Sequence, residues 1–424
     1  MRKLILFPLA ALLAMALWGA LVITGVSQGW GRADPGPRTD VAAFFAKTSD
    51  VIDTRNRGTV AFVLIEKGEV VGEHYVSTGA PVTRDTLFQL ASLSKWATAL
   101  GVLKLVEEGK LDLDAPISTY LTRWQLPESD FGTEGVTARR LLSHTAGLTD
   151  GLGYQGFEPG TPVQTLEESL TQAADPMEGA DGQTRVGIEP GTKWLYSGGG
   201  YALLELLIEE ISGEAFNTYM KRTVLDPLGM SRATFDLEEA EAAGLAPCFD
   251  TEGATCAYRR FAAPAAASLH SSAADLIRFL QGQMRGAEQT FLSPDLAADM
   301  AAKHATQFGI PLWGLGVFLY AAAPGGGYVI GHDGMNFAAI ETTARLDPAT
   351  GDGMIVLATG NPGLAAALGA DWVFWHSGRI DVREFGAMLP VTGALLIAGW
   401  AAILGLAGFI AWRMRRARKQ QNPV

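Results

Sequence analysis

Ser92 and Lys95 have the residue types and the spacing best suited to covalent chemistry in this sequence. They lie in the stretch 87–98, where a short apolar run meets a helical pattern. A helix that begins at Ser92 places the two side chains on one face, one turn apart. A serine hydroxyl needs a neighbour that accepts its proton before it attacks, and a desolvated lysine amine can do this. The alternative is a helix N-cap followed by an exposed lysine, because Ser-x-x-Lys is a short pattern that recurs by chance.

Two further side chains are candidates for proton chemistry. Tyr196 precedes a run of glycines, 198–200, which leads into an amphipathic helix predicted for 201–211. A tyrosine beside such a turn is either held out at a loop tip or buried as part of the core. His144 ends a short helical pattern that runs into a glycine turn, a setting more typical of a structural hydrogen bond than of a catalytic base.

The composition sets the class of protein. With 424 residues, of which 48% are hydrophobic and 18% charged, the chain is long enough for one large domain or two intergrown ones. A net charge of -12, with basic residues dense only at the C-terminus, argues against a nucleic-acid surface. Cys248 and Cys256 lack the spacing of a zinc site, and an oxidising compartment would favour a local disulfide between them. We expect no metal and no cofactor.

Two uncharged runs are long enough to cross a membrane. The first, 4–26, follows Arg2 and Lys3 and is a signal peptide or an anchor, with the anchor favoured because no clear cleavage site follows. The second, 390–412, is followed by a basic tail. Basic flanks stay in the cytoplasm, so the intervening domain is expected on the periplasmic or extracellular side of the cell membrane.

These features predict the following organisation: a signal peptide or anchor at 1–28, a linker at 29–43, a folded domain at 44–380, a transmembrane helix at 388–412 and a basic cytoplasmic tail at 413–424.

The order of the predicted strands and helices indicates an α+β fold for the domain 44–380. A hairpin is predicted from 60–65 and 70–76, and a helical middle section follows. Short strands are then predicted at 313–320, 327–330, 337–346 and 353–358. An antiparallel sheet completed by distant chain segments is therefore expected. Its first strand is nearly all apolar, which favours helices on both faces, as in a three-layer sandwich.

Three separated stretches resemble the active-site motifs of the class C β-lactamase and penicillin-binding-protein-like serine hydrolases. They are Ser92-Leu93-Ser94-Lys95, Tyr196-Ser197-Gly198 and His332-Asp333-Gly334. The segment 141–148, and the segment 190–192 together with 201–204, resemble connecting signatures of the same family, and the similarity covers roughly 44–375. The resemblance implies a three-layer α/β/α sandwich with an antiparallel sheet, beside an all-helical subdomain.

The resemblance also implies catalytic roles. Ser92 would be the nucleophile that becomes acylated, and Lys95 and Tyr196 would share its proton. The backbone N–H groups of Ser92 and Met335 would form the oxyanion hole. Which of Lys95 and Tyr196 acts as the base is left open, because two coupled groups share the work.

Departures from the family pattern concern the predicted substrate-binding residues Gly198, His332, Asp333 and Gly334. Gly198 stands where the family usually has asparagine, and His332 where it often has lysine, so an amide and a permanent cation are missing. Asp333 adds a negative charge where an anionic group of the substrate would sit. We therefore expect hydrolysis of a neutral ester or amide, with an esterase-like activity.

Other functions stay open at this stage. The enzyme alternatives are a β-lactamase, a D-Ala carboxypeptidase or a D-amino-acid peptidase that acts on cell-wall peptides. A non-catalytic binding or sensing module is the alternative of another class. The expected partners are a small-molecule or peptide substrate and the membrane, and the sequence does not predict an oligomeric state.

Overall fold

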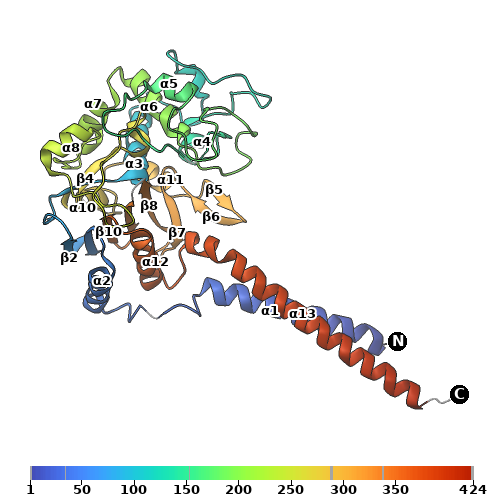
Figure 1. Ribbon diagram of the computed structural model, residues 1–424. Helices are drawn as coiled ribbons and strands as arrows, with labels where there is room; N and C mark the ends of the chain where they lie inside the picture. The colour runs from blue at the N-terminus through green and yellow to red at the C-terminus, as the bar shows by residue number, and fades with distance from the viewer. Residues whose placement is uncertain (1, 34, 152, 287–289, 337–338, 422–424) are drawn as a thin grey trace. The chain divides into compact units, whose positions relative to one another are not determined.

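The computed structural model describes residues 2–33, 35–151, 153–286, 290–336 and 339–421 (Figure 1). The chain divides into two compact units. One is the folded body 36–377, and the other combines the two ends of the chain, 1–35 and 378–424.

The folded body contains an eight-stranded antiparallel sheet with the order β2-β1-β10-β9-β8-β7-β6-β5. The hairpin near the start of this unit pairs with its last strand, as expected for a sheet completed by distant segments. Lys67 and Gly68 turn this hairpin, both with positive φ, as a tight two-residue turn requires. The strands are β1 (Thr59–Glu66), β2 (Glu69–Ser77), β5 (Ala305–Gln307), β6 (Ile310–Trp313), β7 (Phe318–Ala322), β8 (Tyr328–Asn336), β9 (Ile340–Asp347) and β10 (Asp352–Thr359), while β3 (Leu87–Gln89) and β4 (His270–Ser272) form a separate pair. Of the strand predicted at 337–346, residues 337 and 338 lie outside the described residues.

Helices cover both faces of the large sheet. α2 (Val41–Arg55) and α12 (Leu364–Ser377) pack on one face, and α3 (Ser94–Glu107) and α10 (Ala273–Gln281) pack on the other. Phe62 of β1 stacks on Phe45 of α2, whereas Val63 belongs to the core that includes α3. The apolar β1 is therefore covered on both sides, as its sequence indicates. α2 begins inside the predicted linker, because the Asp40 carboxylate accepts a hydrogen bond from Ala43 N at 2.9 Å and caps the helix.

A helical region lies above the sheet in Figure 1, with α6 (Gly199–Ser212) at its centre. Residues 199–208 of α6 are buried all round, so neighbouring helices must enclose it. Those that pack on it are α3, α4 (Ala138–Leu142), α5 (Leu166–Thr171), α7 (Phe216–Met220) and α9 (Pro264–Ala267). The remaining helical segments of this unit are α8 (Leu237–Gly244), α11 (Pro294–Met300), η1 (Ala91–Leu93), η2 (Ile117–Thr119) and η3 (Lys221–Leu225). Cys248 and Cys256 form the expected disulfide.

The second unit consists of α1 (Arg2–Ser27) and α13 (Val382–Gln421), which pack side by side and antiparallel. Trp18 Nε1 donates to the Leu395 carbonyl at 3.1 Å, and Trp400 Nε1 donates to the Met15 carbonyl at 3.0 Å. α13 extends beyond the predicted helix 388–412 at both ends. Segments Pro8–Ser27 and Val382–Arg416 are long and apolar enough to cross a membrane.

Candidate active site

Ser92 lies on the short 3-10 turn η1, immediately before α3. The prediction that the α-helix begins at Ser92 is wrong by two residues, since α3 begins at Ser94. Ala91 has a positive φ of 48°, a conformation that costs a non-glycine residue about 1–3 kcal/mol. Ser94 stabilises this turn through two hydrogen bonds. Its Oγ donates to the Ala91 carbonyl at 2.6 Å and accepts from Leu269 N at 2.9 Å. The strained turn thus holds the Ser92 side chain partly exposed to solvent.

Lys95 lies one turn further along and is almost fully buried, with 2% of its surface exposed. Its Nζ donates to Ser92 Oγ at 3.3 Å and to the Ala266 carbonyl of α9 at 2.7 Å. Burial lowers the pKa of Lys95 to about 7, although the charge of Asp150 raises it in part. A substantial fraction of the amine is therefore neutral near neutral pH, and its lone pair can accept the proton of Ser92.

Tyr196 reaches the same place from the segment before α6. Its ring centroid lies 5.1 Å from Lys95 Nζ, and the ring of Tyr201 lies 5.3 Å from the same atom. Tyr196 is partly exposed, as Ser92 is. The structure therefore brings together the three side chains that the sequence nominated from separate stretches.

His144 holds the Tyr196 segment in place. Its carbonyl accepts from Leu195 N at 2.8 Å, its Nδ1 accepts from Ser197 N at 3.2 Å, and its ring lies 4.3 Å from that of Tyr196. Burial, followed by the nearby Lys95 and His332, lowers the pKa of His144 well below its usual value. A neutral imidazole that accepts from the backbone agrees with the structural role expected for this residue.

Gly334 allows β8 to press directly against the turn that carries Ser92. A Cβ atom at Gly334 would lie 2.0 Å from the Leu90 carbonyl oxygen, so no other residue fits without displacing the backbone. Thr342 of β9 donates from its Oγ1 to the same carbonyl at 2.7 Å. Met335 follows on β8, with a side chain that is 73% exposed. Gly334 therefore serves the close approach of two backbones.

Asp333 does not present its charge to this cluster, and the prediction that it does is wrong. Successive side chains of a strand point to opposite faces, and Asp333 points away from the face of Gly334. Its Oδ1 accepts from Thr343 Oγ1 at 2.6 Å and pairs with Arg345 Nη1 at 2.5 Å. The guanidinium of Arg345 lies against Gly369 of α12. Asp333 is thus neutralised in the layer between the sheet and α12.

His332 lies on the face opposite to Asp333 and is 1% exposed. Its ring packs edge-on to Trp313, with centroids 5.4 Å apart, and lies 5.5 Å from the ring of Phe318. The third motif therefore contributes an enclosed aromatic neighbour where the resembling family often has an extended lysine.

Gly198 has no room for a side chain. A Cβ atom there would lie 2.7 Å from Gly153 Cα and 3.2 Å from the ring of Tyr154. The loop 153–154 thus occupies the space beside Gly198, which accounts for the absence of the usual asparagine.

Sequence reasoning missed two groups near the site. Ala266 contributes only a backbone carbonyl, which no sequence pattern reveals. Asp150 is a buried carboxylate that binds the Tyr196 turn, and its setting in Thr149-Asp150-Gly151 is typical of an ordinary surface turn. Burial was the only signal that would have separated it from such turns, and burial needs the fold.

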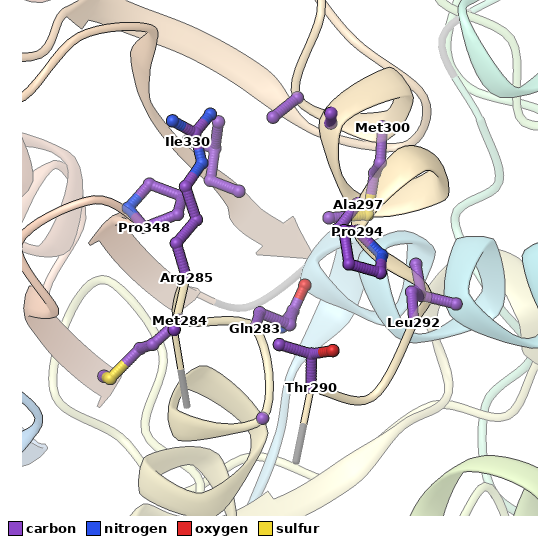
Figure 2. A pocket seen from close by; sticks show the side chains of 14 residues that line it. Gln283, Met284, Arg285, Thr290, Leu292, Pro294, Ala297, Met300, Ile330 and Pro348 are labelled. Carbon is purple, nitrogen blue, oxygen red and sulfur yellow. The ribbon is translucent and has the colours of Figure 1, made fainter. Parts of the chain in front are cut away.

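A cavity of about 270 Å³ lies apart from these residues (Figure 2). Its wall is mainly apolar, and the side chains of Met284, Leu292, Met300 and Ile330 line it. Ser92, Lys95 and Tyr196 are not among the described residues of its lining. Over the described part of the chain, no group of three or more His, Cys, Asp or Glu residues is placed to hold a metal ion.

Comparisons with known proteins agree with this geometry. A family model for β-lactamase matches residues 41–376. A penicillin-binding protein of Bacillus subtilis is 34% identical over 179 residues, which are 41% of this chain and 37% of that protein. The esterase EstB of Burkholderia gladioli is 32% identical over 224 residues, which are 48% of this chain and 54% of that protein. The match thus spans about half or less of each of these relatives.

A solved structure shares the fold. The octameric penicillin-binding protein homologue from Pyrococcus abyssi superposes with a TM-score of 0.64 at 25% identity, covering 78% of this chain and 75% of that one. The family match extends over nearly the whole folded body, from α2 to α12. The chain therefore belongs to the β-lactamase family of serine hydrolases.

Proposed function

We propose that this protein is a membrane-anchored hydrolase that cleaves a neutral ester or amide through an acyl-enzyme on Ser92. The observation that carries the proposal is the contact of 3.3 Å between the buried Lys95 Nζ and the partly exposed Ser92 Oγ. A nucleophile within reach of a base whose pKa is near 7 is the arrangement that serine acylation needs.

The reaction begins with attack of Ser92 Oγ on the substrate carbonyl carbon, while Lys95 and Tyr196 take up the hydroxyl proton. The negative charge then develops on the carbonyl oxygen, where the backbone N–H groups of Ser92 and Met335 would stabilise it. Collapse of this intermediate breaks the bond to the leaving group, which departs with the proton. Water attacks the resulting ester of Ser92 by the same steps and releases the acid.

Three features favour a neutral substrate. Gly198 offers no amide to an acyl side chain, and the loop 153–154 fills the space beside it. His332 is enclosed among aromatic rings and is not an extended cation for a carboxylate. The relative EstB is named an esterase. Asp333 does not contribute to this preference for a neutral substrate, because its carboxylate pairs with Arg345 and does not face the site.

We expect the purified chain to hydrolyse p-nitrophenyl esters of short acids at least about 10-fold more efficiently, in kcat/KM, than nitrocefin. Both substrates are followed by absorbance in the same detergent buffer. Efficient turnover of nitrocefin without ester cleavage would contradict the proposed substrate class.

A peptidase that acts on D-amino-acid peptides is the second candidate, favoured by the relatives named as penicillin-binding proteins. Adding a peptide that ends in D-Ala-D-Ala to the same assay separates the two functions. Release of D-alanine without ester hydrolysis would favour the peptidase.

The membrane anchoring rests on the pairing of α1 with α13. Gly399 of α13 lies against Trp18 of α1, where a Cβ atom would be 2.0 Å from the indole nitrogen, and small residues of this kind permit close helix packing. Both helices then cross the membrane, with Arg2, Lys3 and the basic tail after 412 in the cytoplasm and the body 36–377 outside.

A retained N-terminal helix gives a mass prediction. We expect peptide mass mapping of the chain extracted from membranes to recover the α1 segment Pro8–Ser27 still joined to the residues that follow it. A chain that begins near residue 28 would show that α1 is a cleaved signal peptide and that α13 anchors the protein alone.

A further inference from the structure

Asp150 is a buried carboxylate that the proposed reaction does not use. It lies in the loop after α4 and is 5% exposed. Its Oδ1 accepts from Ser197 Oγ at 2.5 Å, and its Oδ2 accepts from Gly199 N at 2.8 Å. Because α6 begins at Gly199, this carboxylate caps the first turn of a 14-residue helix from a distant part of the chain.

The residue next to this cap is Tyr196. Ser197 Oγ, which donates to Asp150, accepts in turn from Gly200 N at 2.8 Å, so the whole turn 197–200 is held by one carboxylate. Tyr196 is attached directly to this turn, and its ring lies 5.1 Å from Lys95 Nζ. Asp150 therefore holds the turn that directly follows Tyr196.

The negative charge of Asp150 also raises the pKa of Lys95, against the larger effect of burial. The other titratable groups that face Lys95 come from several elements: His144 from the loop after α4, Tyr201 from α6 and Tyr196 from the segment before it. Burial lowers the pKa of His144 and raises the pKa of Tyr201, so both are neutral near pH 7.

Two further acidic groups near Lys95 and Asp150 have raised pKa values. Burial raises the pKa of Glu205 of α6, which accepts from Ala265 N on the helix that binds Lys95, well above its usual value. Tyr154, which faces Asp150, has its pKa raised by burial and then by the charge of Asp150. Burial raises the pKa of Asp150 too, but hydrogen bonds donated to both its oxygens favour the ionised form.

We propose that Asp150 is a positioning residue, whose carboxylate fixes the turn that carries Tyr196 and supplies the negative charge that balances the Lys95 ammonium. This inference rests on the proposed hydrolase function, because it concerns the working protonation state of the same amine.

The test is the pH dependence of Ser92 acylation by a fluorophosphonate probe, measured on the full chain in detergent. In the wild type, the labelling rate is expected to rise with pH through a midpoint near 7, as Lys95 loses its proton and becomes able to act as a base. In Asp150→Asn, burial is no longer opposed by a negative charge, so the midpoint is expected to fall by about one pH unit.

Matched variants separate the charge from the hydrogen bonds. Ser197→Ala removes one hydrogen bond and keeps the carboxylate, so it is expected to lower the melting temperature and to move the midpoint less than Asp150→Asn does. Asp175→Asn alters another buried carboxylate of the same region, which is 8% exposed and accepts from Gly156 N at 2.9 Å. It is expected to leave the midpoint in place. Asp150→Ser, which keeps an acceptor oxygen, takes the place of Asp150→Asn if that variant does not fold.

The outcomes distinguish a failure of the role proposed for Asp150 from a failure of the proposed hydrolase function. An unchanged midpoint in folded Asp150→Asn or Asp150→Ser would overturn the role of Asp150 while leaving the hydrolase intact. An equal shift in Asp175→Asn would overturn it as well, because the effect would then be a general one. Absence of Ser92 labelling in the wild type would instead refute the proposed function.

Discussion

Replacing Ser92 with alanine is expected to lower ester hydrolysis by at least roughly 10³-fold and to abolish covalent labelling. Ser92 Oγ is the atom that would form the acyl bond, and the neighbouring Lys95 amine cannot replace it, because it is buried and also bound to the Ala266 carbonyl. Ester turnover and intact mass after exposure to a fluorophosphonate measure the two effects.

Ser94→Ala is the matched control, since Ser94 lies two residues away on the same turn. It donates to the Ala91 carbonyl and accepts from Leu269 N, so its loss weakens the turn without removing the nucleophile. We expect this variant to melt at a lower temperature and still to carry the probe on Ser92. Labelling that persists in Ser92→Ala, or a label mapped to Ser94, would place the nucleophile elsewhere.

The sequence was sufficient to nominate the reactive cluster because its members follow local rules. The spacing of Ser92 and Lys95 brings their side chains together in a 3-10 turn followed by a helix as well as in one continuous helix. The hairpin of β1 and β2 and the two-sided burial of β1 were also predictable, since turn residues and apolar runs report them directly.

The orientation of β8 was not predictable in the same way. Because successive side chains of a strand alternate between the two faces of the sheet, His332 and Asp333 must point to opposite faces. This alternation does not show which face meets the turn of Ser92. That choice depends on Arg345, which is two residues beyond the β9 partner of Asp333, and on Gly369 of α12. The role of the Ala266 carbonyl, contributed from 171 residues beyond Lys95, likewise depends on the complete fold.

Breaking the buried pair of Asp333 and Arg345 gives the second large effect. Arg345 is 1% exposed and Asp333 9% exposed, and both also contact Thr343. Asp333→Ala removes a carboxylate that pairs with a buried guanidinium, which is expected to lower the free energy of unfolding by about 3–5 kcal/mol. Denaturant unfolding of the detergent-solubilised chain, followed by tryptophan fluorescence, measures the loss.

The size of this loss distinguishes a structural Asp333 from one that faces substrate. Asp181 pairs with Arg185 at 2.6 Å, but both side chains are more than 40% exposed, so Asp181→Ala is expected to cost less than about 1 kcal/mol. Replacing both members of the buried pair, as in Asp333→Leu with Arg345→Met, is expected to recover at least about half of the stability, because the two opposite charges are removed together. If Asp333→Ala lowered the free energy of unfolding as little as Asp181→Ala does, the Asp333 carboxylate would not be part of a stabilising buried ion pair. A position of this carboxylate on the substrate side of the sheet would then be favoured.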